Sequence, residues 1–171
     1  MHSLLCKLTL LFFLLPFNVY GALPEVTRPD VDLPELEEVE QIIKEPGAGI
    51  IFTVRDYDED ALVWLSSRID YYLYLIRKSH PDLPIAILSH GEEVRSLRKD
   101  PEEQYIKLHQ NIQRWIKGYD VTYHVCGSMA DFLGLAHDSF PDYIDVVSHG
   151  PTQVKDYLDF GYHHVELELT W

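Results

Sequence analysis

The stretch YDVTYHVCGSMADFLG at residues 119–134 decides the fold of this chain. Its VTYHV portion is rich in branched and aromatic side chains, which favours a β-strand because such side chains pack well on a pleated surface. Gly127 allows a sharp turn, and Ser128 is a good N-cap for the helix that the following MADFL predicts. We therefore expect Cys126 at the carboxyl end of a strand, next to the positive end of a helix.

This position makes Cys126 a candidate reactive thiol. Ligands bind at the carboxyl edge of the strands in open α/β sheets, and the dipole of a helix N-terminus favours the nucleophilic thiolate. The chain has two cysteines, and the other, Cys6, precedes an N-terminal apolar run that we expect to be removed as a signal peptide, which would leave Cys126 as the only thiol. A lone cysteine in an exported protein suggests an intermolecular bridge or a working thiol, whereas a buried and inert cysteine is the alternative.

The N-terminal segment predicts export. Residues 8–15 form an apolar run that follows Lys7 and is far shorter than the roughly 20 residues needed to cross a bilayer. Val19 and Gly21 are small enough for the positions before a cleavage site. We therefore expect a signal peptide at residues 1–21, cleavage near Gly21, a periplasmic location and no membrane insertion after cleavage.

The composition excludes two classes of partner and suggests the domain boundaries. The formal net charge is −14, so the surface repels nucleic acid and anionic membranes. Residues 22–46 are acidic and rich in proline, which predicts an N-terminal arm with one short amphipathic helix. Residues 47–171 are numerous enough for one α/β domain.

Apolar runs and helical periodicities alternate along this domain. Helical spacing predicts four helices, the second of which has Pro101 at its start and Gly118 at its end. Strands that alternate with helices form parallel sheets, so we predict a three-layer α/β/α fold with a five-stranded, mostly parallel sheet. The predicted strands are 49–54, 85–88, 121–125, 144–147 and 162–169, and the predicted helices are 61–79, 100–117, 129–133 and 151–158.

Four of the predicted strands end in residues that together suggest a site. In a parallel sheet all carboxyl ends lie at the same edge, so these residues would face a shared crevice. A cysteine near two imidazoles can be held as a thiolate, which accepts a sulfane sulfur atom. The predicted site residues are Cys126 as the sulfur acceptor and His90, His149, Gly127, Ser128 and Asp56 as binding residues.

Two alternatives concern metal ions. His90, Cys126 and His149 could hold zinc or copper, because imidazole and thiolate are preferred ligands, but their wide spacing makes this the weaker alternative. The acidic run at residues 56–60 also suggests a metal or acid–base site, but acids before a helix more often cap it and oppose its dipole. We expect no cofactor.

Several of these motifs resemble the DsrE/DsrF-like family of small sulfur-metabolism proteins. The resemblance covers residues 50–167 and is most specific in VCGS at 125–128, VVSHG at 146–150 and GY at 161–162. It implies the three-layer fold and assembly into homo- or hetero-oligomers. In sulfur-relay members, the cysteine at the position of Cys126 carries a persulfide between partner proteins.

Two hypotheses about function follow. The first is a periplasmic, sulfurtransferase-like carrier, in which Cys126 takes sulfane sulfur from a donor protein and passes it to an acceptor. The second is a non-catalytic, homo-oligomeric binding module that uses the same crevice for a small ligand or a metal. A thiol that reacts quickly in the native protein favours the first hypothesis, and an unreactive thiol favours the second.

Overall fold

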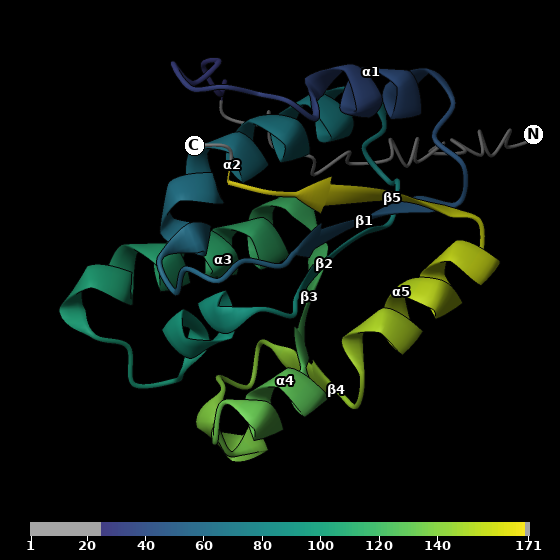
Figure 1. Cartoon of the computed structure of the whole chain (residues 1–171). Coiled ribbons are helices and arrows are strands. Elements are labelled where there is room, and N and C mark those ends of the chain that lie inside the picture. Colours follow the sequence, from purple (N-terminus) through teal and green to yellow (C-terminus); the bar gives the residue numbers. More distant parts are fainter. Residues whose placement is uncertain (1–24, 170–171) are drawn as a thin grey trace, which may run out of the picture.

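Five parallel strands form the centre of the molecule. The structure is a computed structural model that describes residues 25–169, so the signal peptide expected at 1–21 lies outside the described residues. The strand order is β4-β3-β2-β1-β5, and every neighbouring pair is parallel (Figure 1). The predicted α/β class with a five-stranded sheet is confirmed. The strands are β1 (Gly49–Val54), β2 (Ile85–Ser89), β3 (Val121–Cys126), β4 (Asp145–Val147) and β5 (Tyr162–Leu167).

Helices connect these strands on both faces of the sheet. They are α1 (Leu36–Lys44), α2 (Ala61–Ser79), α3 (Ile106–Tyr119), α4 (Gly127–Phe132) and α5 (Gly150–Asp159). Short 3-10 helices lie at Glu92–Leu97, Glu103–Tyr105 and His137–Ser139. Within the described part of the chain, no helix is both long and apolar enough to span a membrane.

The helix α3 differs from its prediction at both ends. A 3-10 turn follows Pro101, and α3 begins only at Ile106, because the side chain of Tyr105 is buried in the core at this turn. The helix also passes through Gly118. Asp120 ends it in the left-handed conformation, with φ at 49°, a conformation that aspartate tolerates better than most residues.

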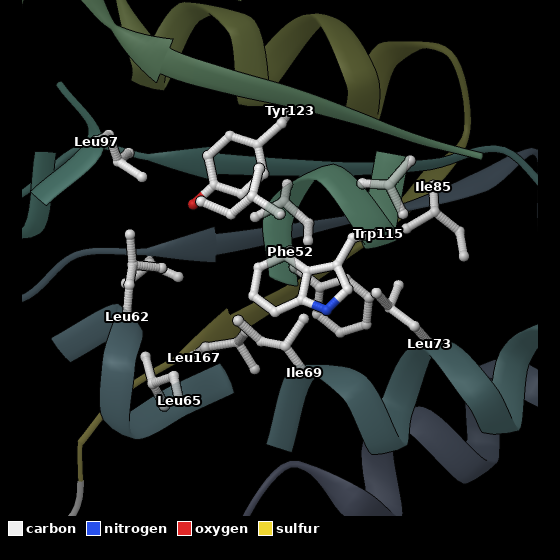
Figure 2. Close-up of a cluster of buried hydrophobic side chains, with 14 of the residues drawn as sticks. Phe52, Leu62, Leu65, Ile69, Leu73, Ile85, Leu97, Trp115, Tyr123 and Leu167 are labelled. Carbon is white, nitrogen blue, oxygen red and sulfur yellow. The ribbon is translucent and has the colours of Figure 1, made fainter. Parts of the chain in front are cut away.

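The main core fills the face of the sheet that α1, α2 and α3 cover. Trp115 of α3, Phe52 of β1 and Tyr123 of β3 are buried together there (Figure 2). The rings of Trp115 and Tyr123 are stacked, with their centroids 6.5 Å apart. Aromatic burial on this scale contributes several kcal/mol to stability.

The acidic N-terminal segment contributes to this core. The short amphipathic helix expected there is present as α1, which packs against α2 and β5. Its Val39 and Ile42 are buried. The boundary expected between an arm and the domain at residues 46 and 47 stays a prediction, although α1 itself packs on the folded body.

The opposite face of the sheet has a much smaller core. Ile51, Ala86 and Leu88 are buried here and pack with Val154 and Tyr157, which α5 provides. Figure 1 shows α5 on the side of the sheet away from α1, α2 and α3. The two outer layers are therefore unequal, and polar side chains lie at the carboxyl ends of the strands on the α5 side.

Candidate active site

The sheet register places two of the predicted site residues next to each other. Ser89 of β2 pairs with Val125 of β3, so the residues that follow them, His90 and Cys126, lie side by side at the carboxyl edge. Gly150, the first residue of α5, covers both. A Cβ atom on Gly150 would lie 3.1 Å from the Cys126 Cβ atom and 3.2 Å from the His90 Cβ atom. Three strand-end segments therefore meet at this point.

The Cys126 thiol sits between two hydrogen-bonding groups. Its Sγ atom accepts the backbone N–H of Gly150 at 3.1 Å, and the Ser128 hydroxyl lies 3.1 Å from the same atom. Cys126 is only 3% exposed. The backbone N–H at the start of a helix carries partial positive charge, so the sulfur faces the positive end of α5.

The helix after the cysteine starts earlier than expected. Cys126 itself is the N-cap residue of α4, and Ser128 lies in the first turn instead of capping the helix. Gly127 is required because space here is small: a Cβ atom on it would lie 2.8 Å from the Val147 carbonyl oxygen and 3.0 Å from the His137 ring. The absence of a side chain at Gly127 therefore lets the start of α4 pack closely against β4, next to the thiol.

His149 and Asp56 have structural roles in their loops. The His149 Nδ1 atom accepts the backbone N–H of Thr152 at 3.3 Å, so this ring caps α5. The Asp56 carboxylate accepts the backbone N–H of Asp58 at 2.9 Å, and the Asp58 carboxylate accepts that of Asp60 at 2.9 Å. These acids order the turn before α2.

His90 is the imidazole that lies nearest the thiol in the sheet register. Burial lowers the pKa of His90, and the nearby Arg55 guanidinium lowers this pKa further, while the Glu166 carboxylate has the opposite effect. His90 is therefore neutral at pH 7. A neutral imidazole beside a thiol is able to accept its proton.

Glu93 is a residue of this region that sequence reasoning missed. Its side chain is fully buried, and its carboxylate accepts the backbone N–H groups of Asp56 at 3.1 Å and Gly91 at 2.9 Å. Burial raises the pKa of Glu93 to about 7. The carboxylate thus joins the loop after β1 to the loop after β2, the loop that begins with His90. In the sequence, Glu93 follows another glutamate and shows no sign of burial.

His124 forms a second polar contact on the α5 face. This side chain is 6% exposed, and its Nε2 atom lies 2.8 Å from the Tyr157 hydroxyl. Its Nδ1 atom has no hydrogen-bond partner, since the Asp145 carboxylate is 3.9 Å away. The position of His124 two residues before Cys126 predicts the shared face, but only the fold shows that Tyr157 reaches it.

The described residues give no support to the metal alternative. No group of three or more histidine, cysteine, aspartate or glutamate side chains within residues 25–169 is placed to hold a metal ion. The expected set of His90, Cys126 and His149 is therefore not among the residues that the described structure groups in this way. The arrangement places one thiol beside one histidine at the carboxyl edge of the sheet, a combination that nucleophilic chemistry uses.

Comparisons with known proteins identify the family. A protein of unknown function, MTH1491 from Methanobacterium thermoautotrophicum, has a similar structure, with 20% identity, a TM-score of 0.51 and coverage of 69% of this chain and 97% of that chain. The ychN protein from E. coli matches with 10% identity, a TM-score of 0.47 and coverage of 70% and 99%. No curated protein matches the sequence. The model of the DsrE/DsrF-like family matches residues 65–167, which is more than half of the chain. The chain therefore belongs to the DsrE/DsrF-like family.

Proposed function

We propose that this protein accepts and passes on sulfane sulfur as a persulfide of Cys126. Family membership suggests a role of the sulfur-relay type. The observation that carries the proposal for this cysteine is the hydrogen bond from the Gly150 backbone N–H to the Cys126 Sγ atom. This donor favours both the attacking thiolate and the persulfide anion that results.

The transfer needs no external oxidant. His90 takes the thiol proton, and the thiolate attacks the sulfane sulfur of the donor. A bond forms between Sγ and that sulfur, the sulfur–sulfur bond of the donor breaks, and the donor leaves with the electron pair. An acceptor thiolate then attacks the outer sulfur and releases the Cys126 thiolate.

The test is the mass of the intact protein after incubation with polysulfide, before and after treatment with a reductant. We expect a gain of one or more sulfur masses that the reductant removes, and no gain in Cys126→Ser. A Ser79→Ala variant, which changes an exposed serine at the end of α2 and keeps the thiol, is the control and should load like wild type. Equal loading of wild type and Cys126→Ser would exclude the proposal.

One observation favours the second hypothesis, a non-catalytic binding module. Cys126 is 3% exposed, and buried cysteines in apolar surroundings are inert. In that case the native thiol resists alkylation and reacts only after unfolding. Alkylation of the native protein at a rate similar to that of the unfolded protein argues against this alternative.

We also propose that the protein works in the periplasm as a homo-oligomer with a sulfur donor or acceptor protein as partner. The location rests on the apolar run near the N-terminus, and the assembly rests on the family resemblance. Amino-terminal sequencing of the protein from a periplasmic fraction tests the location, with Ala22 as the expected first residue. A chain that begins at Met1 and stays in the cytoplasm contradicts it. The mass of the native particle tests the assembly, and a monomeric mass contradicts it.

A further inference from the structure

A row of three side chains crosses the carboxyl edge of the sheet. Val54 of β1 pairs with Ser89 of β2, and Ser89 pairs with Val125 of β3. The next residue of each strand therefore falls into the row Arg55, His90, Cys126. The backbone N–H of His90 continues this pairing by donating to the Val54 carbonyl at 3.0 Å. Two basic side chains thus lie in line with the thiol.

All three side chains of this row belong to the same face. Side chains alternate along a strand, so Arg55 lies on the same side of β1 as Ile51, which is buried under α5. Cys126 also lies on that side, because its Sγ atom contacts the first residue of α5. The row therefore runs along one face of the sheet, from an exposed arginine to the buried thiol.

Arg55 forms no ion pair in the described part of the chain. It is exposed, and no carboxylate within residues 25–169 lies within ion-pair distance of its guanidinium. In contrast, Arg68, Arg95, Arg98 and Arg114 each pair with a carboxylate. The Glu166 carboxylate of β5 raises the pKa of His90 electrostatically. An unpaired guanidinium is notable on a protein whose net charge is −14.

We propose that Arg55 forms a subsite for a small anionic sulfur donor, of the class of thiosulfate or a polysulfide anion, beside His90 and Cys126. This proposal rests on the proposed function and adds to it the class of substrate. An acidic protein repels anions over most of its surface, so a local cation is needed to bring one to the thiol. A guanidinium binds oxyanions through parallel N–H donors, which also orients them.

In this subsite, Cys126 could take the outer sulfur atom of thiosulfate. The Cys126 thiolate attacks the outer sulfur, the bond between Sγ and that sulfur forms, and the sulfur–sulfur bond of thiosulfate breaks. Sulfite leaves with the electron pair, and Cys126 becomes a persulfide anion. Arg55 would hold the oxygen atoms of the departing sulfite, where negative charge increases during the step.

Alkylation with two reagents of similar size tests the subsite without any sulfur chemistry. Iodoacetate is an anion, and iodoacetamide is neutral. We expect Arg55→Gln to slow the reaction of native Cys126 with iodoacetate about three- to tenfold and to change its rate with iodoacetamide less than about twofold. Arg55→Lys keeps the charge and should keep most of the preference. Arg98→Gln, which alters another exposed arginine, is the matched control.

Each other outcome overturns the proposal. A thiol that reacts with neither reagent is closed to small anions. Equal slowing with both reagents shows that Arg55 has a structural role, and an unchanged rate with iodoacetate shows that it attracts no anion. Sulfur loading separates this result from the wider function. Loading from thiosulfate that is equal in wild type and Arg55→Gln refutes the subsite alone, whereas a charge-dependent alkylation without any loading refutes persulfide transfer.

Discussion

At the scale of single residues, Glu93 combines burial with an essential set of hydrogen bonds. Its carboxylate receives the backbone N–H groups of Asp56 and Gly91, which follow different strands. Gly91 has no room for a side chain, since a Cβ atom there would lie 2.4 Å from a Glu93 carboxylate oxygen. Glu93 therefore fixes the loop that carries His90 next to Cys126.

The burial of Glu93 predicts a pH-dependent stability. The folded state holds the Glu93 proton more tightly than the unfolded chain, since its pKa rises from 4.5 to about 7. Stability from this group is therefore fully present below pH 4.5 and is lost as the pH rises to about 7. We expect the free energy of unfolding to fall by about 3 kcal/mol across this window.

Urea unfolding of wild type and Glu93→Gln between pH 4.5 and 8 measures this contribution. The fall should be much smaller in Glu93→Gln, because glutamine does not titrate. Glu92→Gln, which changes the adjacent and partly exposed glutamate, should keep the wild-type profile. Identical pH profiles for wild type and Glu93→Gln would show that Glu93 does not titrate in this range.

At the scale of elements, α5 is the α-helix with the fewest buried residues in the described part of the chain. Gly150 is its one buried residue among those described. Its main attachments are the contact of Gly150 with the thiol and the Tyr157 side chain, which reaches His124 and packs against the Tyr162 ring with centroids 4.8 Å apart. Because Gly150 lies against the thiol, we expect any motion of the start of α5 to change how exposed Cys126 is.

Removal of one hydroxyl group should loosen α5. Tyr157→Phe keeps the ring against Tyr162 but leaves both ring nitrogens of the buried His124 without a partner, which costs about 1–3 kcal/mol. We expect faster hydrogen exchange of the α5 amides and faster alkylation of Cys126, because Gly150 then covers the thiol less of the time. Tyr74→Phe is the control and should change neither rate. Unchanged exchange in Tyr157→Phe would show that this hydrogen bond does not hold the helix.

Elements were easier to predict than contacts between them. The bounds of α2 match the prediction because its apolar positions repeat at helical spacing over the whole length of the helix. The late start of α3 depends on the burial of Tyr105, which local sequence does not reveal. The neighbouring positions of His90 and Cys126 follow from parallel strands ending at one edge. The contacts of the Gly150 N–H with Cys126 and of the Glu93 carboxylate with Asp56 could not be predicted in this way, because each joins segments that are distant in the sequence.

At the scale of the whole molecule, a buried ion pair joins the N-terminal segment to the rest of the chain. Arg68 of α2 donates to the Glu35 carboxylate at 3.0 Å, and the Tyr72 hydroxyl donates to the same carboxylate at 2.9 Å. Arg68 also donates to the Glu168 carbonyl at 2.8 Å, just after β5. One guanidinium therefore links the segment before α1, the helix α2 and the end of the sheet.

Loss of the Glu35 carboxylate should destabilise the whole domain. In Glu35→Ala the Arg68 guanidinium stays buried without its counter-charge, which costs about 3–5 kcal/mol. Glu38→Ala, on the exposed side of α1, should change the free energy of unfolding by about 0.5 kcal/mol or less. Chemical unfolding of both variants measures the difference. A cost below about 1 kcal/mol in Glu35→Ala would show that the ion pair is dispensable.

The strand order also determines when β1 can complete its pairing during folding. β1 lies between β2 and β5, so one of its two ladders needs the last strand, with Gly49 paired to Tyr162 and Val54 to Leu167. During synthesis, one edge of β1 therefore stays unpaired until β5 has been made. Contacts between such distant segments form slowly, and an open strand edge in the interval invites pairing with other chains. A chain cut off before β5 would leave β1 paired with β2 on one side and with no strand on the other.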